Sequence, residues 1–157
     1  MTDTAFVETI QTADCAAAAG ATSVVLSTPY YFPAGQTELG RYIGEVQRAC
    51  PLPIMLYNIP SLTKVTIELE TLKRAAQLDS VVGVKDSGGD TKYFEQLLTL
   101  KSQRPDWSIL IGPEHLTAWA VQQGGDGGVN GGANVFPRLF AQLFTAAESR
   151  DQERVEA

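Results

Sequence analysis

The sequence predicts an α/β fold with a parallel β-sheet, in which strands and helices alternate along the chain. Short apolar runs recur five times, and segments with apolar residues at helical spacing separate them. The intervals of roughly 20 to 30 residues are typical of βα units with right-handed crossovers. Because 157 residues can bury one sizeable core, we expect one domain over residues 1–150 and a frayed charged tail over 151–157.

The first part of the chain contains three predicted helices and two predicted strands. The helices are expected at 5–19, with Thr4 as a possible cap, at about 36–49 and at about 68–78. The strands are expected at 23–27 and 54–57. The segment 58–61, which contains Pro60, is expected to end the second strand.

The second part of the chain repeats the same pattern three times. Strands are expected at 80–85, 108–111 and 127–130, and helices from a cap at Asp90 to about 103, at about 114–122 and at about 136–150. The loops that follow the strands are rich in aromatic, polar or glycine residues. Because parallel strands end at one edge of a sheet, where α/β proteins bind their ligands, we expect these loops to share one face.

Composition excludes several classes of function. A net charge of -6 without any basic run argues against a nucleic-acid surface. No apolar stretch is long enough to span a bilayer, and we expect a cytoplasmic protein. The two cysteines, Cys15 and Cys50, are expected to be buried free thiols, and a single histidine, His115, argues against a metal site.

An open doubly wound sheet is an alternative on pattern alone. The first strand is not followed by Gly-x-Gly-x-x-Gly, and no Walker motif occurs, which argues against a nucleotide site. The glycine-rich stretch 124–132 could cradle a phosphate, or it could let a ligand approach the backbone closely.

Lys85 is the residue most suggestive of chemistry, because it ends an apolar strand just before a polar, glycine-rich turn. One interpretation is an ordinary lysine that reaches solvent. The other is an amine in surroundings of low polarity, which favour its neutral, nucleophilic form and so allow a Schiff base with a carbonyl. Neighbouring parallel strands end about 5 Å apart, so Tyr57 could share a pocket with Lys85.

Four motifs on strand ends, at 28–31, 57–60, 83–86 and 125–134, together resemble the dihydrodipicolinate synthase and N-acetylneuraminate lyase family of pyruvate-dependent class I aldolases. The resemblance extends over nearly the whole chain. It implies a (β/α)₈ TIM barrel, of which this chain would hold about strands 4–8 with helices 3–8. It also implies an enzyme without metal or cofactor, which takes pyruvate or another 2-oxo acid and works as a homo-oligomer, a dimer or tetramer of the full-length protein.

The resemblance assigns roles to individual residues. Lys85 matches the Schiff-base lysine, and Tyr57 matches the tyrosine that moves protons at the intermediate. Tyr31 matches a catalytic aromatic loop residue that, in the synthase branch, reaches across a dimer interface into the proton relay of the neighbouring subunit. Val129 matches the position beside bound pyruvate, and Gly128 and Asn58 are expected to help bind substrate. The alternative interpretation is structural. Tyr57 would then be an aromatic side chain that packs in a layer of the barrel, and Tyr31 would pack in a contact between subunits.

The sequence departs from the family pattern in its strand count. Five predicted strands cannot close a barrel and would leave edge strands and an apolar inner face open. The loop that grips the pyruvate carboxylate in the family is also missing. We therefore expect either a fragment of a longer enzyme or half of an assembly, poorly soluble or oligomeric alone.

The substrate is a further open point. Synthases that accept aspartate semialdehyde usually carry an arginine two residues after the proline of the Tyr-Asn-x-Pro motif, and this position is Leu62 here. The sequence therefore favours cleavage or formation of a 2-oxo-3-deoxy acid. The alternatives are a 4-hydroxy-tetrahydrodipicolinate synthase of lysine biosynthesis and, in another class, a non-catalytic half-barrel that serves as a binding or interaction module.

Overall fold

Five parallel strands form one sheet in the order β1-β2-β3-β4-β5. This computed structural model describes residues 1, 5–31 and 33–156. The strands are β1 Val24–Ser27, β2 Ile54–Asn58, β3 Val81–Asp86, β4 Ser108–Ile111 and β5 Gly127–Gly128. The order in the sheet is the order in the chain, so β1 and β5 lie at the two edges.

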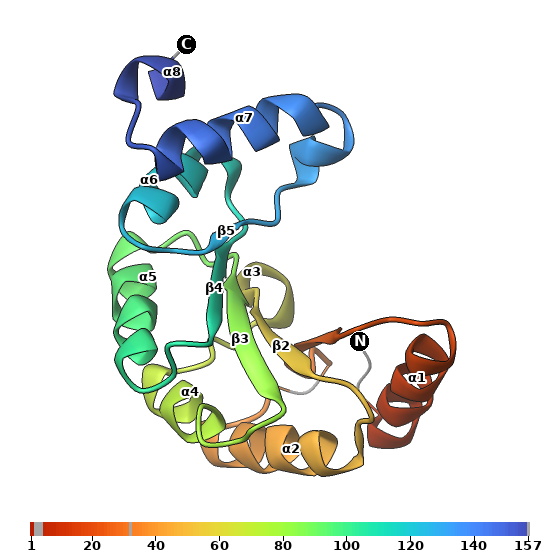
Figure 1. Cartoon of the computed structure of the whole chain (residues 1–157). Helices are drawn as coiled ribbons and strands as arrows, with labels where there is room; N and C mark the ends of the chain where they lie inside the picture. Colours follow the sequence, from red (N-terminus) through yellow and green to blue (C-terminus); the bar gives the residue numbers. More distant parts are fainter. Residues whose placement is uncertain (2–4, 32, 157) are drawn as a thin grey trace.

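Helices surround the outer side of the sheet. They are α1 Phe6–Ala18, α2 Gln36–Ala49, α3 Pro60–Thr63, α4 Leu69–Ala75, α5 Thr91–Leu98, α6 Thr117–Gln122, α7 Pro137–Glu148 and α8 Gln152–Glu156. Three 3₁₀ turns, η1 Thr99–Ser102, η2 Glu114–Leu116 and η3 Gly131–Asn134, lie next to α5, α6 and α7. Figure 1 shows the longer helices following one another in an arc, as expected for consecutive βα units.

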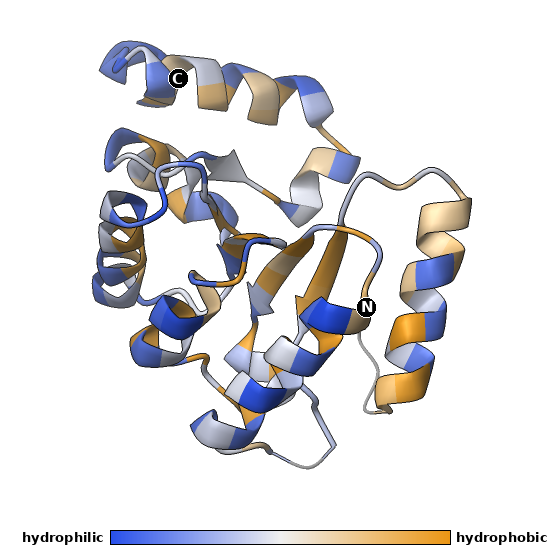
Figure 2. Ribbon diagram, turned by 60° about the horizontal axis from the view of Figure 1, so that its bottom comes forward, coloured by the Kyte–Doolittle hydropathy of each residue, from blue (hydrophilic) through white to orange (hydrophobic). Residues whose placement is uncertain are grey.

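The hydrophobic core lies between the sheet and this helical layer. Leu56 of β2 and Val84 of β3 are fully buried, and so are Ile43 of α2, Leu72 of α4 and Phe94 of α5. Figure 2 shows the apolar colouring concentrated on the strands, whereas the helices carry apolar and polar stretches in turn. Such amphipathic helices cover one face of a sheet and leave the other face to different partners.

Side chains alternate between the two faces of the sheet. In β2, Leu56 and Asn58 are buried against the helices, whereas Tyr57 between them is only half-buried. In β3, Asp86 is buried and Lys85 is half-buried. Successive residues of a strand point to opposite faces, so Tyr57 and Lys85 share the face that the helices do not cover.

The β2–β3 ladder contains a β-bulge near its start. Ile54 pairs with Val81, but Met55 pairs with Gly83, which leaves Val82 without a partner. The bulge shifts the remaining pairs by one residue. As a result, Tyr57 pairs with Lys85 and Asn58 with Asp86.

The structure confirms the parallel βα repeat, the bounds of α2 and the cap of α5. Asp90 accepts hydrogen bonds from the backbone amides of Lys92 and Tyr93. The cap proposed at Thr4 lies outside the described residues. α1 begins after Ala5, which makes no side-chain cap.

Several expectations about helix ends are wrong. The end of the second strand expected at 58–61 is confirmed, since β2 ends at Asn58, but the same segment also begins the short helix α3, which was not expected. Pro60 occupies a first-turn position of α3, where its missing N–H costs nothing. The helix predicted to reach about residue 78 ends at Ala75, and the one predicted to reach 103 becomes 3₁₀ from Thr99. Residues 152–156 form α8 rather than a frayed tail, since Asp151 accepts a hydrogen bond from the Arg154 amide.

The cysteines are free, but the expected burial is wrong. Cys15 is exposed and Cys50 is half-buried. Only Thr9 and Ala13 of α1 are buried, so Cys15 lies outside the narrow face that the helix packs. Among the described helices, none is both long and apolar enough to cross a membrane. The cytoplasmic location stays a prediction.

We predict that Gly83→Ala lowers the free energy of unfolding by about 3 kcal/mol or more, as overpacking at a buried site does. A Cβ at residue 83 would lie 2.1 Å from the Ser108 carbonyl oxygen, which the β3–β4 ladder holds in place. Urea denaturation followed by circular dichroism would measure the change. Gly44→Ala is the matched control: a Cβ there meets nothing within 4 Å, and alanine should stabilise α2 by roughly 0.5–1 kcal/mol. Equal stability of the two variants would contradict the prediction.

Candidate active site

Lys85 and Tyr57 contact each other at the carboxyl ends of β3 and β2. The Lys85 Nζ atom lies 4.2 Å from the centroid of the Tyr57 ring. The pairing of Tyr57 with Lys85 in the parallel ladder explains the contact, because paired residues of neighbouring strands point to the same face. The structure therefore brings together the two residues for which the sequence predicts chemistry.

Ser87 is a third polar residue at this point, and sequence reasoning did not single it out. Its hydroxyl group donates a hydrogen bond to the phenol oxygen of Tyr57 at 3.3 Å. Ser87 follows Lys85 by two residues, so the alternation of a strand already places the two side chains on one face. Gly112 makes room for the hydroxyl, since a Cβ there would lie 2.0 Å from Ser87 Oγ.

Asn58 lies on the opposite face of the sheet, away from Lys85 and Tyr57. Its side-chain nitrogen donates to Asp86 Oδ1 at 2.6 Å, and its side-chain oxygen accepts from the Ile67 amide at 3.0 Å. Asn58 is 1% exposed and Asp86 is fully buried. The structure thus gives the Asn58 side chain structural partners, and its expected contribution to substrate binding receives no support from this geometry.

Burial dominates the electrostatics of Asp86. Loss of hydration raises the pKa of its carboxyl group, whereas the hydrogen bonds from Asn58 and the Gly88 amide, and the nearby Gly89 amide, lower it. Tyr93 of α5 is a neighbouring buried group, and burial followed by the negative charge of Asp86 raises the pKa of its phenol. Neither group faces the Lys85 side of the sheet, so both belong to the support of the site.

The loop after β5 closes against the loop after β4. Asn130 donates a side-chain hydrogen bond to the Gly112 carbonyl at 2.9 Å, and the Gly132 amide donates to Glu114 at 2.5 Å. The amide of Val129 donates to the Ile111 carbonyl at 2.9 Å, and the Val129 side chain is half exposed. These bonds hold Gly128 and Val129 at the same edge of the sheet as Lys85.

Tyr31 lies in the loop after β1, which pairs with β2. Its side chain is 72% exposed. That exposure fits a residue at the carboxyl edge of the sheet, the edge to which Tyr57 also belongs. The structure does not test the catalytic role expected for Tyr31, or the binding roles expected for Val129 and Gly128, and these stay predictions.

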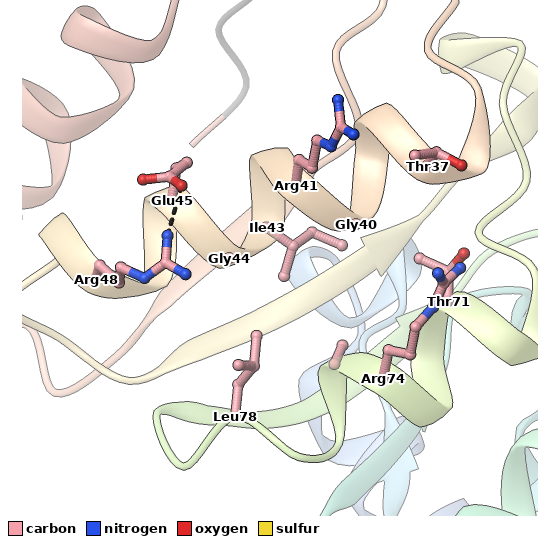
Figure 3. A pocket seen from close by; sticks show the side chains of 11 residues that line it. Thr37, Gly40, Arg41, Ile43, Gly44, Glu45, Arg48, Thr71, Arg74 and Leu78 are labelled. Carbon is pink, nitrogen blue, oxygen red and sulfur yellow. Dashed lines mark hydrogen bonds and ion pairs between the residues drawn. The ribbon is translucent and has the colours of Figure 1, made fainter.

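A separate groove of about 390 Å³ lies on the outer surface between α2 and α4. Figure 3 shows Gly40, Ile43 and Gly44 of α2 on one side of it and Arg74 and Leu78 on the other, with Arg48 bonded to Glu45. No residue predicted for the site lines it. Among the residues that the structure describes, no three His, Cys, Asp or Glu side chains cluster as metal ligands would.

The dihydrodipicolinate synthetase family profile matches residues 3–157, which is nearly the whole chain. The chain belongs to this family. Its fold is therefore part of a (β/α)₈ TIM barrel, as the sequence predicts, with five of the strands in one parallel sheet.

Three solved structures of this family's fold superpose closely on the chain. A dihydrodipicolinate synthase from Bacteroides thetaiotaomicron is 43% identical with a TM-score of 0.93, and the alignment covers 99% of this chain and 52% of that one. YagE, a prophage protein of the dihydrodipicolinic acid synthase family from Escherichia coli K12, was solved in complex with pyruvate and is 29% identical, with a TM-score of 0.90 and 99% and 52% coverage. A 2-keto 3-deoxygluconate aldolase from Picrophilus torridus is 26% identical, with a TM-score of 0.90 and 99% and 56% coverage.

The chain spans about half the length of the curated relatives it matches. Two of them are 35% identical over 150 residues, which make up 96% of this chain and 48% of theirs. The five-stranded arc is thus the counterpart of roughly half of a family barrel.

We predict that the titration of Asp86 lowers the free energy of unfolding of the chain as the pH rises above about 4, the ordinary pKa of aspartate. Between that value and the raised pKa of folded Asp86, the folded chain keeps a proton that the unfolded chain has lost. The stability that comes from the raised pKa of Asp86 is therefore fully present at low pH, and it is lost as the pH rises through that pKa.

Urea unfolding of the wild type and of Asp86→Asn between pH 4 and 7 tests this prediction. The asparagine cannot titrate, so the stability of the wild type relative to the variant should fall with rising pH. A difference that stays constant or increases would contradict it.

Proposed function

We propose that this chain carries the imine-forming site of a Schiff-base lyase or synthase that acts on pyruvate or on a 2-oxo-3-deoxy acid. The observation that carries the proposal is the contact between Lys85 Nζ and the Tyr57 ring at the carboxyl edge of a parallel sheet. Membership of the dihydrodipicolinate synthetase family supports it, and so does the pyruvate complex of the similar YagE.

The chemistry begins with attack by the neutral amine of Lys85 on the C2 carbonyl of the 2-oxo acid. A nitrogen–carbon bond forms, the carbonyl oxygen leaves as water with the two protons of the amine, and one proton taken up from solvent leaves the imine protonated on the enzyme. This iminium accepts an electron pair from C3 when a C3–H bond loses its proton or a C3–C4 bond breaks. Condensation and aldol cleavage are then the two directions of one reaction.

Tyr57 is proposed to carry the proton that leaves or returns at C3. A phenol requires a tuned environment for this work near neutral pH, because its ordinary pKa is about 10. The hydrogen bond that Ser87 donates to the phenol oxygen holds the Tyr57 hydroxyl group in place for this transfer. Tyr31 is proposed to extend this proton path across an interface between protomers, and the amides around Gly128 and Val129 to lie beside the bound acid.

A 2-oxo-3-deoxy sugar acid is the substrate that Leu62 favours. Leu62 is 70% exposed on α3 and offers no charge to a second carboxylate. The neighbouring Lys64 donates to the Ser61 carbonyl at 2.6 Å, so its ammonium group is already engaged. The second candidate is 4-hydroxy-tetrahydrodipicolinate synthase activity, which the 43% identity with the Bacteroides thetaiotaomicron synthase favours. No comparison favours the non-catalytic half-barrel.

We predict that pyruvate and borohydride together attach one pyruvyl group to Lys85. Borohydride reduces the imine to a stable secondary amine, which mass spectrometry of the Lys85 peptide detects. Lys92 is the matched internal control, since it lies seven positions further along the same segment, at the start of α5. A folded wild-type chain without an adduct, or with equal labelling of both lysines, would contradict the proposed function.

We also predict that the chain turns over 2-keto-3-deoxygluconate faster than it condenses pyruvate with aspartate semialdehyde. Release of pyruvate from the first compound and loss of the semialdehyde in the second assay can be measured by coupled absorbance. Leu62→Arg should shift the preference toward the semialdehyde, because a guanidinium group can bind a carboxylate through two hydrogen bonds. Efficient synthase activity in the unchanged chain would rule out the argument from Leu62.

A further inference from the structure

We propose that Asp86 is a positioning residue, whose hydrogen bonds to Asn58 and to the Gly88 amide hold Lys85 and Tyr57 in contact on the other face of the sheet. This inference rests on the proposed function, because it gives these two side chains the chemistry. Asp86 itself is buried in the helix-facing layer and does not share their face.

The contacts of Asp86 are few for a buried carboxyl group. Oδ1 accepts from Asn58 at 2.6 Å and from the Gly88 amide at 3.2 Å, and Oδ2 has no hydrogen-bond partner. A buried acid with an unsatisfied oxygen costs stability relative to an apolar side chain of similar size. Packing alone therefore does not explain an acid at this position. Its bonds to Asn58 and Gly88 do explain it, because they fix these two residues relative to each other.

The position of Asp86 in the chain links it to the site. It lies between Lys85 and Ser87, and both of these residues approach Tyr57. Its backbone carbonyl accepts from the Gly112 amide at 2.7 Å, and the Ser87 amide donates to the Asn58 carbonyl at 2.8 Å. The ends of β2, β3 and β4 are thus fastened to one another around Asp86.

The network extends from Asn58 to the helical layer. The Asn58 side-chain oxygen accepts from the Ile67 amide, and the Tyr93 phenol of α5 donates to the Ile67 carbonyl. Linked hydrogen bonds in a buried layer strengthen one another and resist displacement. A change at the Asn58–Asp86 bond should therefore move the strand ends rather than only one side chain.

Exchange of the two residues tests the proposal. Asn58→Asp sets two carboxyl groups against each other where one bond of 2.6 Å now exists. The double variant Asn58→Asp with Asp86→Asn again places a side-chain amide opposite a carboxylate, and residue 58 can still accept from the Ile67 amide. The Gly88 amide loses its acceptor, because Asp86 Oδ1 accepts both bonds in the wild type and an amide nitrogen must take its place. The chain is labelled with ¹³C-lysine, and the ε-methylene protons of Lys85 report the contact, because the Tyr57 ring current shifts their resonance.

We expect Asn58→Asp to abolish the ring-current shift at pH 8. The limiting rate of pyruvate trapping by borohydride should fall about 10- to 100-fold, the size of effect seen when supporting hydrogen bonds are lost. The pyruvate concentration for half-saturation should change much less. The double variant should recover part of the shift and part of the rate, since the two substitutions restore the bond between residues 58 and 86 but not the bond from the Gly88 amide.

Asp90→Ala is the matched control. It removes a carboxylate from the same loop and weakens the cap of α5, but Asp90 bonds neither Asn58 nor Gly88 through the contacts described for its side chain. It should lower the melting temperature and leave the Lys85 shift unchanged.

A folded Asn58→Asp chain with the wild-type Lys85 shift and trapping rate would overturn the proposal. If that variant does not fold, Asp86→Ala takes its place with the same two measurements and the same criterion. A double variant whose Lys85 shift and trapping rate are no closer to the wild type than those of Asn58→Asp would also overturn it. A wild-type chain that traps no pyruvate, but whose Lys85 shift follows the exchange as expected, would refute the proposed function and leave the positioning role standing.

Discussion

The register between β2 and β3 is the constraint on which the rest of the site depends. The bulge at Val82 shifts the ladder by one residue, and only then does Tyr57 pair with Lys85. In the unshifted register Tyr57 would pair with Val84, and Lys85 would pair with Asn58. Because side chains alternate along a strand, a slip of one residue moves every group to the opposite face.

Most of the fold and the central pair of the site follow from local pattern. Five apolar runs at regular intervals require parallel pairing through crossovers, and the strand-end loops then share an edge. Lys85 and Tyr57 were identifiable because polar groups at the ends of buried strands are unusual. Side chains alternate between the two faces along a strand, and this rule, continued past Lys85, places Ser87 on the face of Lys85. The same rule turns Asn58 and Asp86 toward the helices.

The features that the sequence did not reveal depend on tertiary contacts or on a choice between equally plausible local structures. A proline can end one helix or begin another, and at Pro60 the chain begins one. At the start of α8, the Asp151 side chain accepts a hydrogen bond from the Arg154 amide. In the sequence, Asp151 stands in a run of charges that resembles a solvated tail. The bond between Asn58 and Asp86 joins residues on different strands, and a single sequence contains no signal for such a pair.

The agreement between strand order and chain order has a consequence for how the molecule acquires its structure. Every ladder joins units that are consecutive in the sequence, so each pairing closes only a modest loop and loses little chain entropy. Each pairing still requires a complete crossover first, which makes parallel sheets slower to form than helical bundles. Assembly can therefore start at the central β2–β3 ribbon, which has the most extensive ladder, and grow outward in both directions, with β1 and β5 adding last as in a stack of repeats.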